Sequence, residues 1–190
     1  MLSKYANRLL SMLVLLAVLA GCNKYNKLTD PNEAALGKTL DQLVKENPSL
    51  SKFNEYLVKT GYDKVLATSK MFTVWAPDNQ ALASLDPTIV QSDSLLKQFV
   101  GGYIANLAYY TNMPNPQLRV KTLNGKYIFF RQTQFEDATI TSANQYVANG
   151  VLHVINKAVL PKQNVYEYLQ TTTSKEKDYI NSMFFTFIDS

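Results

Sequence analysis

The spacing of apolar residues changes along the chain, and this change limits the fold more than any other feature. Up to about residue 110, apolar residues recur mainly at helical spacing, with one short strand-like run at residues 71–75. From Leu118 onwards, short runs rich in β-favouring residues and separated by turn signals indicate strands. Because helices come first and strands later, without strict alternation, the pattern favours an α+β domain over a doubly wound parallel sheet.

The first two helices are predicted from their ends. Thr39-Leu40-Asp41-Gln42 has the form of a capping box and predicts a helix to about Glu46. Asn47-Pro48 predicts the start of a second helix, because Asn can cap a helix and Pro suits its first position. Gly61 can end this second helix. Its core positions are expected at Leu50, Phe53 and Leu57.

A longer helix is predicted to begin at Ser92 or Asp93. Its periodicity is strong, although Gly101-Gly102 interrupts it at a cost of about 1 kcal/mol per glycine relative to alanine. Such a pair suggests a close backbone approach to a neighbouring element, or a bend. The apolar positions of this helix are Leu95, Leu96, Phe99, Val100, Tyr103, Ile104 and Leu107.

The clearest strand signal is Asn124-Gly125, which favours a two-residue hairpin turn between strands at residues 118–123 and 126–131. Further strands are expected at residues 138–141, 145–148 and 151–155. The earlier run at residues 71–75 is also expected to be a strand that Pro77 stops, and Asp78 can cap a small helix after it.

The N-terminus has the form of a bacterial export signal. Lys4 and Arg8 precede an apolar stretch, residues 9–20, that is too short to span a bilayer. Leu19-Ala20-Gly21-Cys22 resembles the bacterial lipobox, which implies a lipid on Cys22 and cleavage before it. The expected organisation is a signal peptide at residues 1–21 and a polar tether at residues 22–36.

The lipobox resemblance implies that the lipid on Cys22 holds the protein to a membrane of the cell envelope. The outer membrane is expected, although the residues after Cys22 leave the choice of membrane and leaflet open. The alternative is an ordinary signal peptide in which the cysteine falls by chance.

The composition argues against several classes of function. Cys22 is the only cysteine and His153 the only histidine, which excludes an intrachain disulfide and a cysteine-based zinc site. Loss of residues 1–21 removes two basic residues and no acid, which lowers the net charge from +4 to +2. No stretch clusters the basic residues, so no nucleic-acid partner is expected. We also find no phosphate-binding loop or hydrolase motif, and expect no cofactor, no metal and no catalytic residue.

Two segments together resemble the signatures of the fasciclin domain family. The first is Phe72-Thr73-Val74-Trp75-Ala76-Pro77-Asp78-Asn79-Gln80-Ala81-Leu82, and the second runs from Asn149-Gly150-Val151-Leu152-His153-Val154-Ile155 through to Pro161. The resemblance implies a wedge of about six to seven strands packed against several helices, over residues 37–161. It also implies a non-catalytic module for adhesion, or for binding an extracellular protein or glycan.

The resemblance assigns family-motif positions within these segments and departs from the family at one point. Members often carry a Tyr-His pair near the end of the central helix, and Tyr103 stands here where histidine is usual, which argues against integrin-type adhesion. The family-motif residues are Thr73, Ala76, Pro77, Asp78, Tyr103, Asn149, Gly150, His153, Val154, Ile155 and Pro161.

Three groups could carry chemistry, and each also has a structural interpretation. His153 alternates with Val151 and Ile155, which favours a buried, hydrogen-bonded histidine over a general acid or base. Adjacent strand residues point to opposite faces, so Glu136-Asp137 is not expected to form a two-carboxylate site. About half of the aromatic residues of the second half should pack the core, and the rest could form a platform for sugars or a partner protein. These residues include Tyr109, Tyr110, Tyr127, Phe129, Phe130 and Tyr146.

Residues 162–190 are interpreted as C-terminal helices. They are either the start of an incomplete second fasciclin-like domain, which we favour, or a helix packed on the first. The functional prediction is therefore a membrane-anchored binding module. The alternative is a structural or accessory component of an envelope complex, such as a glycan-uptake system.

Overall fold

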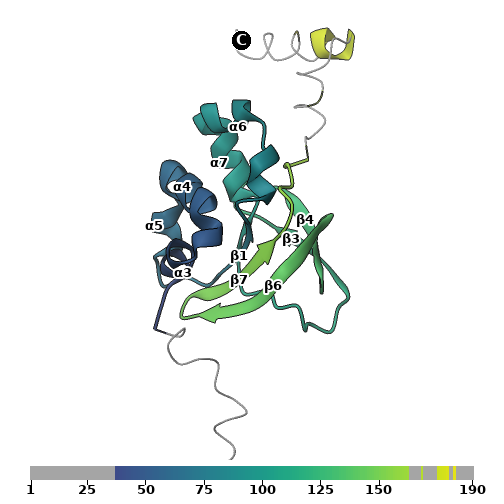
Figure 1. Ribbon diagram of the computed structural model, residues 1–190. Helices are drawn as coiled ribbons and strands as arrows, with labels where there is room; N and C mark the ends of the chain where they lie inside the picture. The colour runs from purple at the N-terminus through teal and green to yellow at the C-terminus, as the bar shows by residue number, and fades with distance from the viewer. Residues whose placement is uncertain (1–36, 163–167, 169–174, 180–181, 183–190) are drawn as a thin grey trace, which may run out of the picture.

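The structure is a computed structural model that describes residues 37–162, 168, 175–179 and 182. Helices form the first half of this region and strands dominate the second, as Figure 1 shows, which confirms the predicted α+β class. The helical elements are α3 (Leu40–Glu46), η3 (Pro48–Leu50), α4 (Ser51–Thr60), α5 (Tyr62–Leu66), η4 (Ala81–Ser84), α6 (Pro87–Gln91) and α7 (Asp93–Gly101). The strands are β1 (Phe72–Pro77), β2 (Ile104–Asn106), β3 (Gln117–Lys121), β4 (Tyr127–Arg131), β5 (Gln134–Phe135), β6 (Ala138–Val147) and β7 (Gly150–Ile155).

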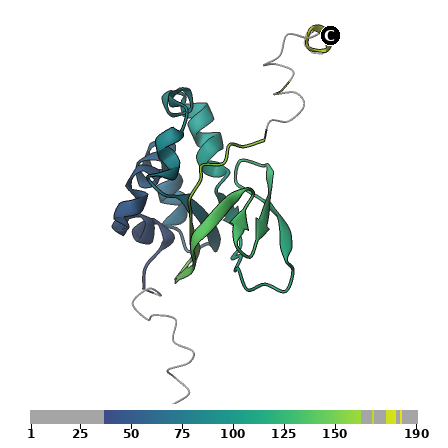
Figure 2. The same ribbon diagram turned by 45° about the vertical axis from the view of Figure 1, so that its right-hand side comes forward.

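Within the described residues, the strands form one seven-stranded sheet in the order β2-β1-β7-β6-β5-β4-β3. Only the β1–β7 pair of this sheet is parallel, and the other neighbours are antiparallel. The helices gather on one side and the β3–β4 hairpin lies on the other, as Figures 1 and 2 show together. This arrangement is the predicted wedge of strands packed against helices.

The β1–β7 pair lies at the centre of the domain. Every residue of both strands is buried, as is typical of parallel strands covered on both faces. Trp75 lies opposite His153 in the register, and both rings contact Phe130 of β4. The pair therefore lies inside one continuous core that joins the rings under the hairpin to the buried residues of the helices.

The predicted helix caps are present. The Thr39 side chain accepts from the backbone N–H of Gln42, and the Gln42 side chain accepts from the backbone N–H of Thr39, which completes the capping box. Gly61 adopts the left-handed conformation that ends α4, with φ at 76°. Of the two candidates for the start of α7, Ser92 is the cap, because its hydroxyl accepts from the N–H of Leu95.

The central helix is shorter than predicted. It ends at Gly101, and Ile104–Asn106 form strand β2 instead of a further helical turn. Antiparallel pairing of β2 with β1 overrides the helical spacing of Tyr103, Ile104 and Leu107. The glycine pair does mark a close approach, because a Cβ atom at Gly101 would lie 2.5 Å from the Tyr62 hydroxyl.

The predicted hairpin is present, but its turn is not the two-residue turn predicted, and two strand boundaries are corrected. Lys121 pairs with Tyr127, which centres the connection on Asn124, whereas a two-residue turn at Asn124-Gly125 would place Lys121 opposite Ile128. Gly125 has a φ of 83°. The strands predicted at 138–141 and 145–148 are one strand, β6, whose register shifts twice between Ile140 and Gln145. The strand expected at residues 71–75 is β1, which runs from Phe72 to Pro77. Pro77 ends it, as predicted, and lies opposite Ile155.

Several predictions fall on residues that the structure does not describe. Cys22, the signal peptide at residues 1–21 and the tether at residues 22–36 lie outside the described residues. Most of the C-terminal segment does as well, and its described residues 168, 175–179 and 182 are helical. The two interpretations of that segment stay predictions.

Candidate functional site

Asn149, at the start of the second family-like segment, joins three parts of the domain. Its side chain is 2% exposed, and its Oδ1 accepts from the backbone N–H of Leu40 at 2.8 Å. The Nδ2 group donates to the carbonyl oxygens of Leu66 and Thr68, each at 2.6 Å. Asn149 thus ties the start of α3 and the end of α5 to β7, which is a structural role.

Gly150 follows and cannot be another residue without strain. Its φ is 152°, and a Cβ atom there would lie 2.0 Å from the carbonyl oxygen of Phe72. Glycine at this position therefore allows β7 to lie against β1.

His153 is enclosed in the aromatic core. Its Nδ1 accepts from the backbone N–H of Asn144 at 3.2 Å, so the proton of the neutral ring is on Nε2, which donates to the carbonyl oxygen of Tyr109 at 2.9 Å. The ring stacks on Trp75 with a centroid distance of 6.1 Å. Burial lowers the pKa of His153 below its ordinary value, and the hydrogen bond to Tyr109 offsets part of this shift.

The surroundings of His153 decide between its two interpretations. The side chain is 0% exposed and both ring nitrogens bond to backbone groups. A general acid or base must reach a substrate, and this ring does not. The prediction of a buried, hydrogen-bonded histidine is confirmed.

The first family-like segment is also structural. The Thr73 hydroxyl donates to the carbonyl oxygen of Leu107 at 2.7 Å and accepts from the N–H of Tyr109 at 2.8 Å. The carboxylate of Asp78 accepts from the N–H of Ala81 at 2.7 Å, which confirms its predicted capping role. The other family-motif residues Ala76, Pro77, Val154 and Ile155 are buried strand residues, and Pro161 is partly buried after β7.

Tyr103, which stands where the family usually has histidine, is held inside the domain. Its hydroxyl donates to the carbonyl oxygen of Val159 at 2.8 Å and accepts from the N–H of the same residue at 2.6 Å. The ring stacks on Phe135 and meets Phe53 and Phe99 edge to face. Burial raises the pKa of Tyr103 above that of free tyrosine. Tyr103 thus fastens the segment after β7 to the core and does not reach the surface.

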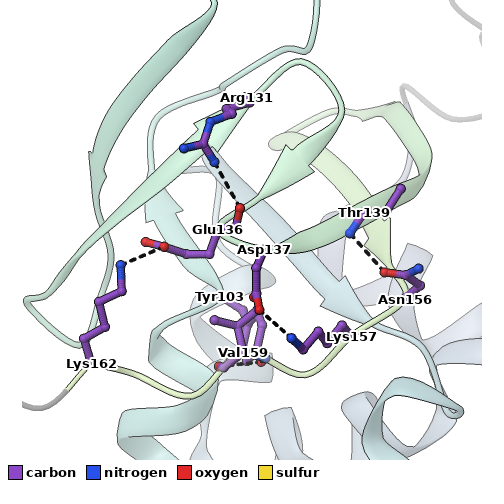
Figure 3. A network of polar contacts seen from close by, with 9 residues as sticks. All are labelled: Tyr103, Arg131, Glu136, Asp137, Thr139, Asn156, Lys157, Val159 and Lys162. Atoms are coloured by element: carbon purple, nitrogen blue, oxygen red, sulfur yellow. Dashed lines mark hydrogen bonds and ion pairs between the residues drawn. The ribbon is translucent and has the colours of Figure 1, made fainter.

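The acidic pair lies in a network of ion pairs (Figure 3). Glu136 accepts from the Phe129 N–H at 2.9 Å through Oε1 and pairs with Lys162 at 2.8 Å through Oε2, while Asp137 pairs with Lys157. The hydrogen bond from Lys157 is the main reason that the pKa of Asp137 is below its usual value. The two carboxylates belong to separate pairs, as expected, although they line a common surface groove of about 570 Å³.

The aromatic residues divide between the core and the surface. Phe130 and Tyr109 contact Trp75 inside the domain, at centroid distances of 5.2 and 6.1 Å. Tyr127 and Tyr146 are exposed, and Tyr146 lies 5.5 Å from Tyr110. The predicted division of these residues between the core and the surface is therefore present, and a platform for sugars or a partner protein stays a prediction.

Sequence reasoning missed the cations beside the exposed rings. The guanidinium of Arg119 lies 4.2 Å from the ring centroid of Tyr127, and that of Arg131 lies 6.0 Å from Phe129. The side chains of each strand alternate between the two faces of the hairpin. Only the cross-strand register shows that the cations of β3 share a face with the rings of β4. The signal available in the sequence was the alternation on both sides of Asn124-Gly125.

The described part of the chain holds neither a cluster of metal-ligating side chains nor a helix that could span a bilayer. No group of three or more His, Cys, Asp and Glu side chains is placed there to hold a metal ion. None of the helices described has the length and apolar content of a bilayer-spanning segment.

Comparison with known proteins identifies the family. Residues 48–161 match the fasciclin domain, which is more than half of the chain, and no curated protein matches the sequence. A solved FAS1 domain pair from the insect cell adhesion molecule fasciclin I has the same fold, with 22% identity and a TM-score of 0.51. The similarity covers 76% of this chain and 56% of that structure, so the chain corresponds to about half of it. Fasciclin domains are generally non-catalytic adhesion or interaction modules. The chain belongs to the fasciclin domain family.

Proposed function

We propose that this protein is a lipid-anchored lipoprotein of the bacterial cell envelope whose fasciclin domain binds an extracellular protein or glycan. The observation that carries the proposal is the order of two features along one chain. The lipobox-like sequence ends at Cys22, and the fasciclin domain match begins at residue 48. A polar segment between them suits a tether that holds a binding domain off a membrane.

The interior of the domain supports a binding role at the surface and argues against catalysis. Asn149, His153 and Tyr103 carry the buried polar side chains most suited to chemistry, and each bonds to backbone groups that hold the fold. A partner would therefore meet the outer surface of the sheet or helices. A lipid-anchored protein needs no further membrane segment if it carries two or more acyl chains.

Anchoring is tested by metabolic labelling with a fatty acid in a bacterial host. We expect the wild-type chain to incorporate label and fractionate with membranes, and the Cys22→Ser variant to do neither. Equal incorporation by the two chains would refute lipidation at Cys22. Fractionation of the inner and outer membranes in the same experiment decides the location.

Binding is tested with the full lipoprotein in neutral detergent on an array of glycans and matrix proteins. We expect saturable binding without turnover of the ligand. A chain that binds nothing on the array but retains one stable partner through detergent extraction would instead be an accessory component of an envelope complex. A product released from an array ligand would contradict a non-catalytic role.

A further inference from the structure

We propose that the outer face of the β3–β4 hairpin binds a linear anionic polysaccharide that carries carboxylate or sulfate groups. This inference rests on the proposed binding function and names the class of its ligand. The surface, called here the cationic face, is formed by Arg119, Lys121, Arg131 and Lys162 around the rings of Tyr127 and Phe129.

The hairpin register brings these side chains to one face. Arg119 lies opposite Phe129, and Lys121 lies opposite Tyr127. Residues two apart on a strand are about 6.8 Å apart and point to the same side, so Arg119 and Lys121 form a row along β3. The intervening residues Leu118 and Val120 point to the core side. The result is a row of positive charge that follows the strand.

The arginines of this strip are held in position. Arg119 lies over the Tyr127 ring at 4.2 Å. Arg131 donates from Nε to the Gln117 side chain at 2.9 Å and from Nη1 to the carbonyl oxygen of Glu136 at 3.1 Å. A guanidinium that is already oriented loses less conformational entropy when it binds, and its planar fork matches carboxylate and sulfate oxygens.

The charges of Arg119 and Lys121 on the cationic face are not neutralised by a described acidic side chain. Across the described residues, no carboxylate forms an ion pair with Arg119 or Lys121, and both side chains are exposed. The carboxylate of Glu136 is only 12% exposed and already accepts from the Phe129 N–H and from Lys162. An incoming anion would therefore meet positive charge without competition from a neighbouring acid.

The shape of the strip favours a polysaccharide over an acidic protein. Protein partners gain most of their affinity from side chains buried in pockets, whereas here a cation lies over each of the two rings. A linear polymer that repeats its charge can follow a row of cations along a strand. Tyr127, which is 49% exposed, adds a hydroxyl at the edge of the row for sugar hydroxyls.

The strip also lies away from the start of the domain. The chain enters at Lys38, whose carbonyl accepts from the N–H of Ala148 at the β6–β7 turn. In the sheet, strands β6, β5 and β4 lie between β7 and β3. The end of the domain that the predicted tether would join is therefore separated from the cationic face by several strands.

The test measures binding of the full lipoprotein, in neutral detergent, to immobilised dextran, carboxymethyl dextran and dextran sulfate. These three polymers share one backbone and differ in charge. We expect binding to the two charged forms and none to dextran. Arg119→Gln/Lys121→Gln should weaken binding at least tenfold, and Lys52→Gln/Lys64→Gln, which removes the same charge from exposed positions on α4 and α5, should change it less than twofold. Tyr127→Leu keeps the charge and should weaken binding several-fold by releasing Arg119.

Three outcomes would overturn the proposal. The first is equal loss of binding in the two charge-matched variants, which would mean non-specific attraction. The second is tighter binding to polyglutamate than to dextran sulfate, which would identify an acidic protein as the partner. The third is wild-type binding to an array ligand that Arg119→Gln/Lys121→Gln leaves unchanged, with no binding to charged dextrans. This last outcome would remove the cationic face while leaving the proposed binding function intact, whereas no binding to any array ligand or polymer would contradict both.

Discussion

Phe129 and Phe130 are neighbours on β4, yet they belong to two different parts of the molecule. Phe130 is 2% exposed and contacts Trp75 and His153 at 5.2 and 5.5 Å. Phe129 points to the other side, where Arg131 and Lys162 lie over its ring. The alternation of a strand therefore places the same side chain in the core at one position and among surface cations at the next.

The two faces of the hairpin also differ in how their polar groups are used. On the inner side, the His153 ring is bonded through both nitrogens to backbone groups. On the outer side, Arg119 has a ring for support and no carboxylate within the described residues. The difference teaches that substitutions inside should lower the stability of the fold, whereas substitutions outside should mainly lower binding.

The largest expected effect on stability comes from removing the inner ring, that of Phe130. Phe130→Ala should lower the free energy of unfolding by about 3–5 kcal/mol, because it leaves a cavity beside Trp75. Phe129→Ala, the matched variant one residue away, should cost about 1 kcal/mol or less. Equilibrium urea unfolding followed by the fluorescence of Trp75, the only tryptophan, measures both. Equal losses would remove the distinction between the two faces.

Tyr103→Phe tests a hydrogen bond that the core makes to the segment after β7. The variant keeps the ring but leaves the N–H and carbonyl of Val159 without the hydroxyl. We expect the free energy of unfolding to fall by about 2 kcal/mol. Urea unfolding measures the loss, and an unchanged midpoint would show that the hydroxyl contributes nothing to stability.

The pH dependence of stability tests the burial of His153. Because burial lowers its pKa in the folded state, the unfolded chain binds the proton first as the pH falls below about 6.5. The contribution of a neutral His153 is therefore complete above that pH and is lost as the pH falls, with a slope of at most about 1.4 kcal/mol per pH unit. Urea unfolding of wild type and His153→Gln between pH 5 and 7.5 should show the steeper fall in wild type. Parallel curves would mean that His153 titrates alike in both states.

The smallest effects are expected from the surface ion pairs of Figure 3. The side chains of Lys157 and Asp137 are 58% and 64% exposed, so Lys157→Gln should cost about 0.5 kcal/mol or less. Lys162→Gln should cost more, because its partner Glu136 is only 12% exposed. Thermal unfolding at low and high salt ranks the two variants, and the reverse order would contradict this account of burial.

Features that depend on neighbouring residues could be predicted from the sequence. The Thr39 capping box, the end of α4 at Gly61 and the hairpin at Asn124-Gly125 each need only a few adjacent residues. Strand β2 could not be predicted, because the helical spacing of residues 95–107 is real and pairing with β1 decides the structure there. In such segments, tertiary contacts decide the secondary structure, and the local sequence pattern does not.

The same division applies to the candidate sites. The structural role of His153 followed from its alternation with Val151 and Ile155, which all lie on one buried strand. The cationic face could not be found in this way, because Arg119 and Tyr127 are on different strands and meet only through the hairpin register. The two-residue turn predicted at Asn124-Gly125 would shift the register by one residue and place Arg119 opposite Phe130, so the composition of this face follows from the observed register.

The parallel β1–β7 pair has a consequence for how the chain folds. Phe72 lies opposite Gly150, 78 residues later, and all residues of both strands are buried. Closing so long a loop is entropically costly, and chains dominated by distant contacts fold slowly. The pair at the centre of the domain should therefore form late, after α3 to α7 and the hairpin. Until β7 pairs with β1, β1 offers an unpaired apolar edge that the strand of another chain could join.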